Sequence, residues 1–175
     1  MAVGVQTLVR ARVAGVAFSA HPLDADRDCI VVEAVLGLGV PAVSGAVRPE
    51  HIELTRARQI SRRSPARQER LHVADARGVR EEPVRCQVGA TEGAVLDDVE
   101  LDSVVDMVLA VETVVGFPVD VEWAVASAPG EPVVVSLLQA RPIAPAPNRR
   151  PGWPSGQRSA FRSAERFVPA RAKGS

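Results

Sequence analysis

The feature that most constrains the fold is a pair of strand-like stretches in which polar side chains alternate with apolar ones. The first stretch, DVEWA, runs from Asp120 to Ala124, and the second, LLQARPI, runs from Leu137 to Ile143. A turn at Ala128-Pro129-Gly130 lies between them and would let the second stretch return antiparallel to the first. The chain is therefore expected to contain a β-sheet in which these two strands are neighbours.

The same alternation gathers four polar side chains. Successive side chains on a strand point to opposite faces, so Asp120 and Glu122 share one face, and Gln139 and Arg141 share a face on the returning strand. If the register matches, two carboxylates, an amide and a guanidinium converge. Such a group suits a magnesium-bound polyphosphate. On spacing alone, a solvated sheet face with cross-strand ion pairs is the more frequent interpretation.

Composition limits the size and the class of the protein. The chain has 175 residues, 46% hydrophobic and 24% charged, which suits one globular core. Its net charge of zero is uneven, because residues 148–175 hold seven basic residues and one acid, whereas the first 147 hold 14 basic and 20 acidic residues. The acidic excess of the first part argues against a nucleic-acid partner.

Cysteine usage and hydropathy bear on the compartment. Cys29 and Cys86 have no metal-ligand spacing and give no disulfide framework, so a cytoplasmic location is the simplest expectation. No apolar run approaches the roughly 20 residues of a membrane span, and the N-terminus lacks a signal sequence. We therefore expect a soluble protein without a membrane partner.

The pattern along the chain predicts an α+β fold, with a mostly antiparallel sheet of six or more strands backed by helices. A capping pair at Asp97 and Glu100, apolar residues at helical intervals and a terminating Gly116 predict a helix at about 98–115, and a shorter helix is expected after Gly39. Arg56 to Arg70 is expected to be a solvated loop or hairpin tip. Strands are expected at residues 2–9, 14–22, 29–35 and 51–55. The strand at 2–9 would be an unpaired edge of the sheet, and the strand at 51–55 would be a solvent-edge strand.

Several of these stretches resemble one protein family. DVEW followed by LQARPI, and EAVLGLGVPAVSGAVRP from Glu33 to Pro49, resemble the ATP-binding domain of the pyruvate phosphate dikinase, phosphoenolpyruvate synthase and rifampicin phosphotransferase family, an ATP-grasp fold. The resemblance covers residues 1–147. The chain departs from the family pattern at Val40-Pro41, where the family usually has a glutamate, and at His21, where an acidic or amide residue is more usual.

The resemblance implies ATP and Mg²⁺ as cofactors and assigns roles to five residues. Glu122 and Gln139 would coordinate Mg²⁺, and Arg141 would hold the terminal phosphates and stabilise their charge in the transition state. Asp120 would lie near the nucleotide or the metal. Gln6 would contact the nucleotide, although a polar residue on an exposed strand face is an equally good interpretation. The 17-residue interval between Glu122 and Gln139 is longer than in most relatives, and a register change there would separate the group.

The resemblance also implies a division of the chain and two partners. Residues 1–147 would be the C-terminal portion of an ATP-grasp nucleotide-binding domain, and residues 148–175 a disordered basic tail. The family's N-terminal ATP-grasp lobe, which carries phosphate-binding lysines, and its phosphohistidine domain would be missing partners, since residues 1–147 contain no lysine.

Two hypotheses follow. The chain is either the ATP-binding lobe of a phosphotransferase like phosphoenolpyruvate synthase or rifampicin phosphotransferase, or a non-catalytic truncated remnant or interaction module that retains the fold. The motifs do not distinguish pyruvate from an antibiotic as the phosphoryl acceptor.

Overall fold

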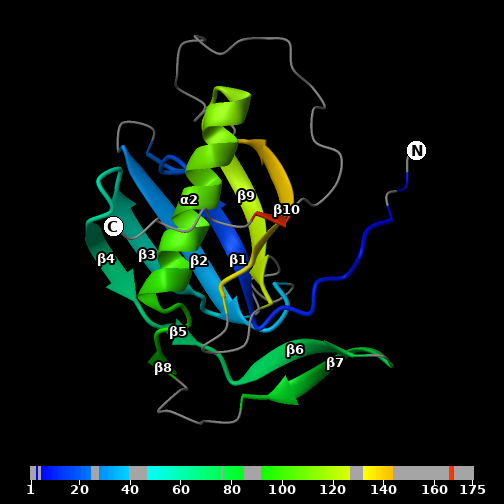
Figure 1. The fold of residues 1–175 in the computed structure, drawn as a ribbon. Coiled ribbons are helices and arrows are strands. Elements are labelled where there is room, and N and C mark those ends of the chain that lie inside the picture. The colour runs from blue at the N-terminus through cyan, green and yellow to red at the C-terminus, as the bar shows by residue number, and fades with distance from the viewer. Residues whose placement is uncertain are drawn as a thin grey trace, which may run out of the picture.

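The main body of the protein is an antiparallel β-sheet (Figure 1). The computed structural model describes residues 3, 5–24, 28–39, 47–75, 77–84, 92–126, 132–143 and 166–167. Within these residues the sheet has seven strands in the order β11-β10-β9-β1-β2-β3-β4, and every neighbouring pair is antiparallel. The strands are β1 (Val13–Phe18), β2 (Cys29–Leu36), β3 (Glu50–Thr55), β4 (Ile60–Ser64), β9 (Val119–Val125), β10 (Val135–Pro142) and β11 (Arg166–Phe167).

One helix, α2 (Asp98–Val115), lies across one face of this sheet (Figure 1). The expected capping box is confirmed: the Glu100 N–H donates to Asp97 Oδ1 at 2.8 Å, and the Asp97 N–H donates to Glu100 Oε2 at 3.1 Å. The helix ends at Gly116, whose φ of 78° is the left-handed conformation that glycine adopts without strain. Among the described residues, no helix is long and apolar enough to cross a membrane.

The hydrophobic core lies between α2 and the sheet. Its largest fully buried side chain is Trp123 on β9, which packs beside Ile30 on β2 and Ile52 on β3 in one cluster with the apolar face of the helix. Helix residues at positions 101, 104, 105, 108 and 111 contribute to that cluster, so the apolar face of α2 packs against the sheet. The α+β architecture expected from the sequence is therefore confirmed.

Two small antiparallel pairs lie beside the main sheet. The hairpin of β6 (Arg70–Asp75) and β7 (Gly78–Pro83) and the pair of β5 (Ala66–Arg67) and β8 (Glu92–Gly93) lie beyond one end of the helix in Figure 1. Gln68 joins them to the sheet, because its side chain accepts from the Leu36 N–H and donates to the Leu36 carbonyl, both at 2.9 Å.

The structure corrects three expectations. Residues 5–12 form no strand but an arm that lies outside the sheet up to its last residue, Arg12 (Figure 1). Arg12 itself is still held, since its N–H donates to the Val125 carbonyl at 2.8 Å and its carbonyl accepts from the Gly37 N–H at 2.7 Å. Strand β3 is not a solvent edge, since β4 covers it. The stretch from Arg56 to Arg70 begins with the expected hairpin tip, between β3 and β4, but continues into β4 and β5.

Some expectations lie largely outside the described residues. These include the shorter helix after Gly39 and the turn at 128–130. Of residues 148–175 the structure describes only β11, which pairs with β10 at Val135 and Ser136, so the expectation of a disordered tail also lies largely outside the described residues.

Candidate functional site

The register of β9 and β10 brings the four polar side chains together. Gln139 lies directly opposite Glu122, and Arg141 lies directly opposite Asp120. Val121 and Trp123 alternate with the two acids on β9 and belong to the core under α2. The four polar residues therefore lie on the opposite face of the sheet, which α2 does not cover and which is named the open face for that reason. The juxtaposition expected from the sequence is therefore found.

An irregularity in β10 makes this register possible. Leu137 pairs with Trp123 and Gln139 pairs with Glu122, so Leu138 is an extra residue at a β-bulge. In an unbroken ladder Leu138 would face Glu122, and Gln139 would lie opposite Val121 on the helix side. The bulge moves Gln139 and Arg141 to the open face while Val135 keeps its place in the core.

Asp120 and Arg141 form a cross-strand ion pair. Arg141 Nε donates to Asp120 Oδ2 at 2.7 Å, and this hydrogen bond, helped by the charges of Asp120 and Glu122, raises the pKa of Arg141 above its ordinary value. The Arg141 side chain is 53% exposed, whereas Asp120 is 14% exposed. Within the described residues the two terminal nitrogens of Arg141 have no hydrogen bond, so they remain available to an anion.

The second oxygen of Asp120 is buried without a partner. Asp120 Oδ1 has no hydrogen bond among the described residues, although burying a carboxylate oxygen without a donor or a cation is costly. Glu122 and the Gln139 amide supply further oxygen atoms on the same face. This donor set fits a hard cation such as Mg²⁺, which takes one or two carboxylates and completes its shell with water and phosphate oxygens. No cluster of three or more His, Cys, Asp or Glu side chains suited to a metal occurs among the described residues.

Gln6 is not brought to these four residues. It is exposed in the arm of residues 5–12, outside the sheet (Figure 1). Val5 and Leu8 in the same arm are 97% and 57% exposed. The role of Gln6 stays a prediction.

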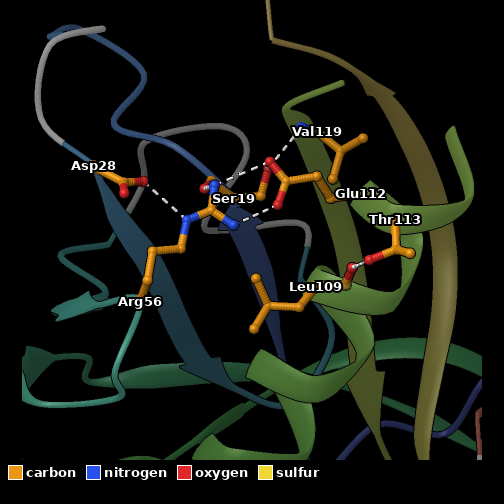
Figure 2. Close-up of polar contacts among 7 residues, drawn as sticks. All are labelled: Ser19, Asp28, Arg56, Leu109, Glu112, Thr113 and Val119. Carbon is orange, nitrogen blue, oxygen red and sulfur yellow. Dashed lines mark hydrogen bonds and ion pairs between the residues drawn. The ribbon is translucent and has the colours of Figure 1, made fainter. Parts of the chain in front are cut away.

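Two further polar groups were not singled out by the sequence. His51 on β3 lies between Glu33 and Glu53 on the open face, with Nδ1 3.2 Å from Glu33 Oε1 and Nε2 3.3 Å from Glu53 Oε1. At the end of α2, Arg56 joins Glu112 and Ser19 (Figure 2). Glu112 is an acidic residue in the last turn of the helix, and this turn has no basic residue. That pattern is the sequence signal that could have indicated a basic partner for Glu112 from elsewhere in the chain.

Comparison with known proteins shows the family to which the chain belongs. Residues 1–154 match the family described as "Pyruvate phosphate dikinase, AMP/ATP-binding domain". The chain belongs to this family. It is an AMP/ATP-binding domain of the type found in phosphoenolpyruvate synthases and pyruvate phosphate dikinases.

Relatives of this AMP/ATP-binding domain carry two kinds of name. A probable phosphoenolpyruvate synthase of Methanocaldococcus jannaschii is 37% identical over 144 residues, covering 82% of the chain and 12% of the relative. A rifampicin phosphotransferase of Streptomyces sviceus is 31% identical over 143 residues, 82% of the chain and 16% of the relative. A phosphoenolpyruvate synthase of Deinococcus radiodurans is 30% identical over 151 residues, 81% of the chain and 19% of the relative. The chain thus spans less than a fifth of the length of these relatives.

Proposed function

We propose that the β9–β10 pair forms the phosphate- and metal-binding end of the nucleotide site, in a lobe of an ATP-dependent phosphotransferase. The register of these strands carries the proposal, because it sets Gln139 against Glu122 and Arg141 against Asp120 on an open sheet face. The membership of the chain in an AMP/ATP-binding domain family supports it.

Each of the four residues has a distinct part in this proposal. Glu122 and Gln139 supply oxygen ligands to Mg²⁺, and Arg141 presents its terminal nitrogens to the β- and γ-phosphates. Asp120 holds the Nε of Arg141 and so fixes the plane of the guanidinium. Its Oδ1, which is buried and has no hydrogen bond among the described residues, would help to hold the cation directly or through a water. Bound Mg²⁺ would supply charge neutralisation for the departing phosphoryl group, and Arg141 would stabilise the same charge.

The activity of the whole protein is a further part of the proposal. Relatives named phosphoenolpyruvate synthase and rifampicin phosphotransferase are much longer than this chain. We infer that the lobe acts with a lysine-bearing N-terminal ATP-grasp lobe and with a domain whose histidine carries the phosphoryl group. The absence of lysine from residues 1–147 supports the first of these, whose lysines would add to the binding that the β9–β10 pair provides.

Isothermal titration of Mg-ATP into the 175-residue chain tests the site. Glu122→Gln and Arg141→Ala are each expected to raise Kd at least about tenfold, since a hydrogen bond to a charged group contributes about 1.5–3 kcal/mol. Arg70→Ala is the matched control, because Arg70 also uses Nε to bind a cross-strand carboxylate, Glu81 Oε2 at 2.8 Å, on the β6–β7 hairpin. Its Kd should not change.

The titration also separates the two functional hypotheses. Binding that is unchanged in both site variants would mean that the four residues form an ordinary solvated ion-paired face. Absence of Mg-ATP binding by the unmodified chain would support the alternative of a non-catalytic remnant or interaction module.

A further inference from the structure

The start of β9, one residue before Asp120, is held by a partly buried polar network at the end of α2 (Figure 2). Ser19, which follows β1, is fully buried, and it lies between the backbone of Val119 and the carboxylate of Glu112. Arg56, the residue after β3, completes the network. Three segments far apart in the sequence thus meet where the strand of the candidate site begins.

The hydrogen bonds of Ser19 have only one consistent direction. The Val119 N–H donates to Ser19 Oγ at 2.9 Å, and the Ser19 N–H donates to the Val119 carbonyl at 2.9 Å. A hydroxyl has a single hydrogen and a carboxylate can only accept, so Ser19 donates that hydrogen to Glu112 Oε1 at 3.1 Å. The backbone of Val119 is therefore linked through one hydroxyl to an ionised side chain on the helix.

Glu112 is fixed in turn by Arg56. An acidic side chain in the last turn of a helix is disfavoured by the helix dipole, and this turn has no basic residue. Arg56 compensates from outside the helix: Nη1 and Nη2 donate to the two Glu112 oxygens, and Nη2 also donates to the Ser19 carbonyl at 2.8 Å. Its Nε donates to Asp28 at 2.9 Å. The bidentate contact raises the pKa of Arg56 above its ordinary value, so the guanidinium stays charged and the network stays intact.

The network lies next to the ion pair of the candidate site. Asp120 follows Val119 directly, and its Oδ2 accepts the Nε hydrogen bond that orients Arg141. Its opposite neighbour on β1 is Phe18, the residue before Ser19. A change at Ser19 therefore acts on Val119, which precedes Asp120, and on Phe18, which lies opposite Asp120.

We propose that Ser19, with Glu112 and Arg56 behind it, is a positioning residue for nucleotide binding. It sets the place of the Asp120 carboxylate and, through it, the direction in which Arg141 presents its terminal nitrogens. This inference rests on the proposed function, and it adds three residues that touch neither metal nor phosphate.

A double-mutant cycle on the full chain tests this role. Mg-ATP is titrated into the unmodified chain, Ser19→Ala, Asp120→Asn and the double variant. Ser19→Ala is expected to raise Kd about fivefold alone and to have no further effect in the Asp120→Asn background, because coupled residues are non-additive. Ser19→Thr, which keeps the hydroxyl, is expected to restore binding.

Two variants guard against a general loss of structure. Ser103→Ala removes another largely buried hydroxyl, one that donates only to the Val99 carbonyl within α2, and its Kd should equal that of the unmodified chain. Glu112→Gln removes the charge that Ser19 and Arg56 bind. Thermal melting shows whether Ser19→Ala folds, and if it does not, Glu112→Gln takes its place in the cycle.

The outcomes distinguish this inference from the proposed function. Equal losses of binding in both Asp120 backgrounds, or an equal loss in Ser103→Ala, overturn the positioning role alone. If Glu122→Gln weakens binding and Ser19→Ala does not, the positioning role is also overturned while the proposed function stands. If the unmodified chain does not bind Mg-ATP, the proposed function and the positioning role fail together.

Discussion

At the scale of single residues, the sheet beneath the site depends on a glycine with no room for a side chain. Gly15 on β1 lies between Ala34 on β2 and Trp123 on β9. A Cβ at this position would overlap the Glu33 carbonyl oxygen and lie 3.0 Å from Trp123 Cζ2. The indole of Trp123 can fill the core only because position 15 carries a hydrogen atom.

Gly15→Ala is expected to lower the free energy of unfolding by about 1–3 kcal/mol, the usual cost of overpacking a core. Urea denaturation followed by tryptophan fluorescence measures the change. Gly39→Ala is the control, since a Cβ there would meet Ala14 Cβ at an ordinary 3.5 Å. Equal effects of the two substitutions would contradict the proposed close contact.

Arg141→Lys tests whether shape matters as well as charge. A lysine keeps the positive charge but lacks the planar fork that binds Asp120 through Nε and leaves two nitrogens for phosphate. We expect Kd for Mg-ATP to rise about tenfold despite the retained charge. Titration of Arg70→Lys, which should behave like the unmodified chain, provides the comparison, and full binding by Arg141→Lys would show that a point charge suffices.

At the scale of elements, the bulge in β10 decides which side chains reach the open face. Leu138 is the extra residue, so its deletion leaves Leu137 opposite Trp123 and Gln139 opposite Glu122. Deletion of Ala140 instead moves Arg141 from opposite Asp120 to opposite Val121, on the helix side.

The two deletions are therefore expected to differ in binding. Loss of Leu138 should change Kd for Mg-ATP by less than about threefold, whereas loss of Ala140 should weaken binding by more than about tenfold, because a one-residue slip reverses the faces. Titration measures both, and circular dichroism checks that both chains keep their sheet. A similar weakening in the two chains would argue against the assigned register.

Much of this element structure could be predicted from the sequence, because it depends on local patterns. Alternation predicted the shared face of Asp120 and Glu122, and the capping pair predicted the start of α2. The two consecutive leucines before Gln139 break the alternation and were the available signal for the bulge. The arm of residues 5–12 has the alternation of a strand, but only Arg12 bonds to the neighbouring backbone among the described residues, and alternation alone does not show that a partner exists.

Contacts between distant segments could not be predicted in the same way. Arg56 was expected to be a solvated arginine in a connector, yet it binds Glu112 on α2, and a separation of 56 positions leaves no local pattern. The same holds for Ser19, whose partners Val119 and Glu112 lie about a hundred residues further along the chain. Residues of this kind are fixed by the tertiary fold.

At the scale of the whole molecule, α2 is tied to the sheet at both ends by carboxylates. Near its start, the fully buried Glu50 of β3 accepts from the Val95 and Leu96 N–H groups at 2.9 and 3.1 Å, and Arg63 of β4 binds the same carboxylate at 2.9 Å. At its end, Glu112 plays the corresponding part. The helix therefore keeps a fixed position over the core on one face of the sheet.

Arg63→Ala is expected to destabilise the protein without affecting the site. The substitution leaves Glu50 as a buried anion without its cation, which costs about 3 kcal/mol, and chemical denaturation should show that loss. Kd for Mg-ATP should not change as long as the chain is folded, in contrast to Ser19→Ala. Arg62→Ala is the control, because its exposed guanidinium lies 3.6 Å from Glu53 and should contribute less than about 1 kcal/mol. Weakened nucleotide binding in Arg63→Ala would contradict the separation of the two ends of the helix.

The alternation along β9 has a consequence for how such a chain can change over generations. Replacement of Val121 or Trp123 removes packing that the protein needs in order to accumulate, whereas replacement of Asp120 or Glu122 leaves that packing in place. Inherited variants can therefore erase ligand recognition while cells still make the protein in full amount. The amount of protein in the cell would then not reveal that the domain no longer binds its ligand.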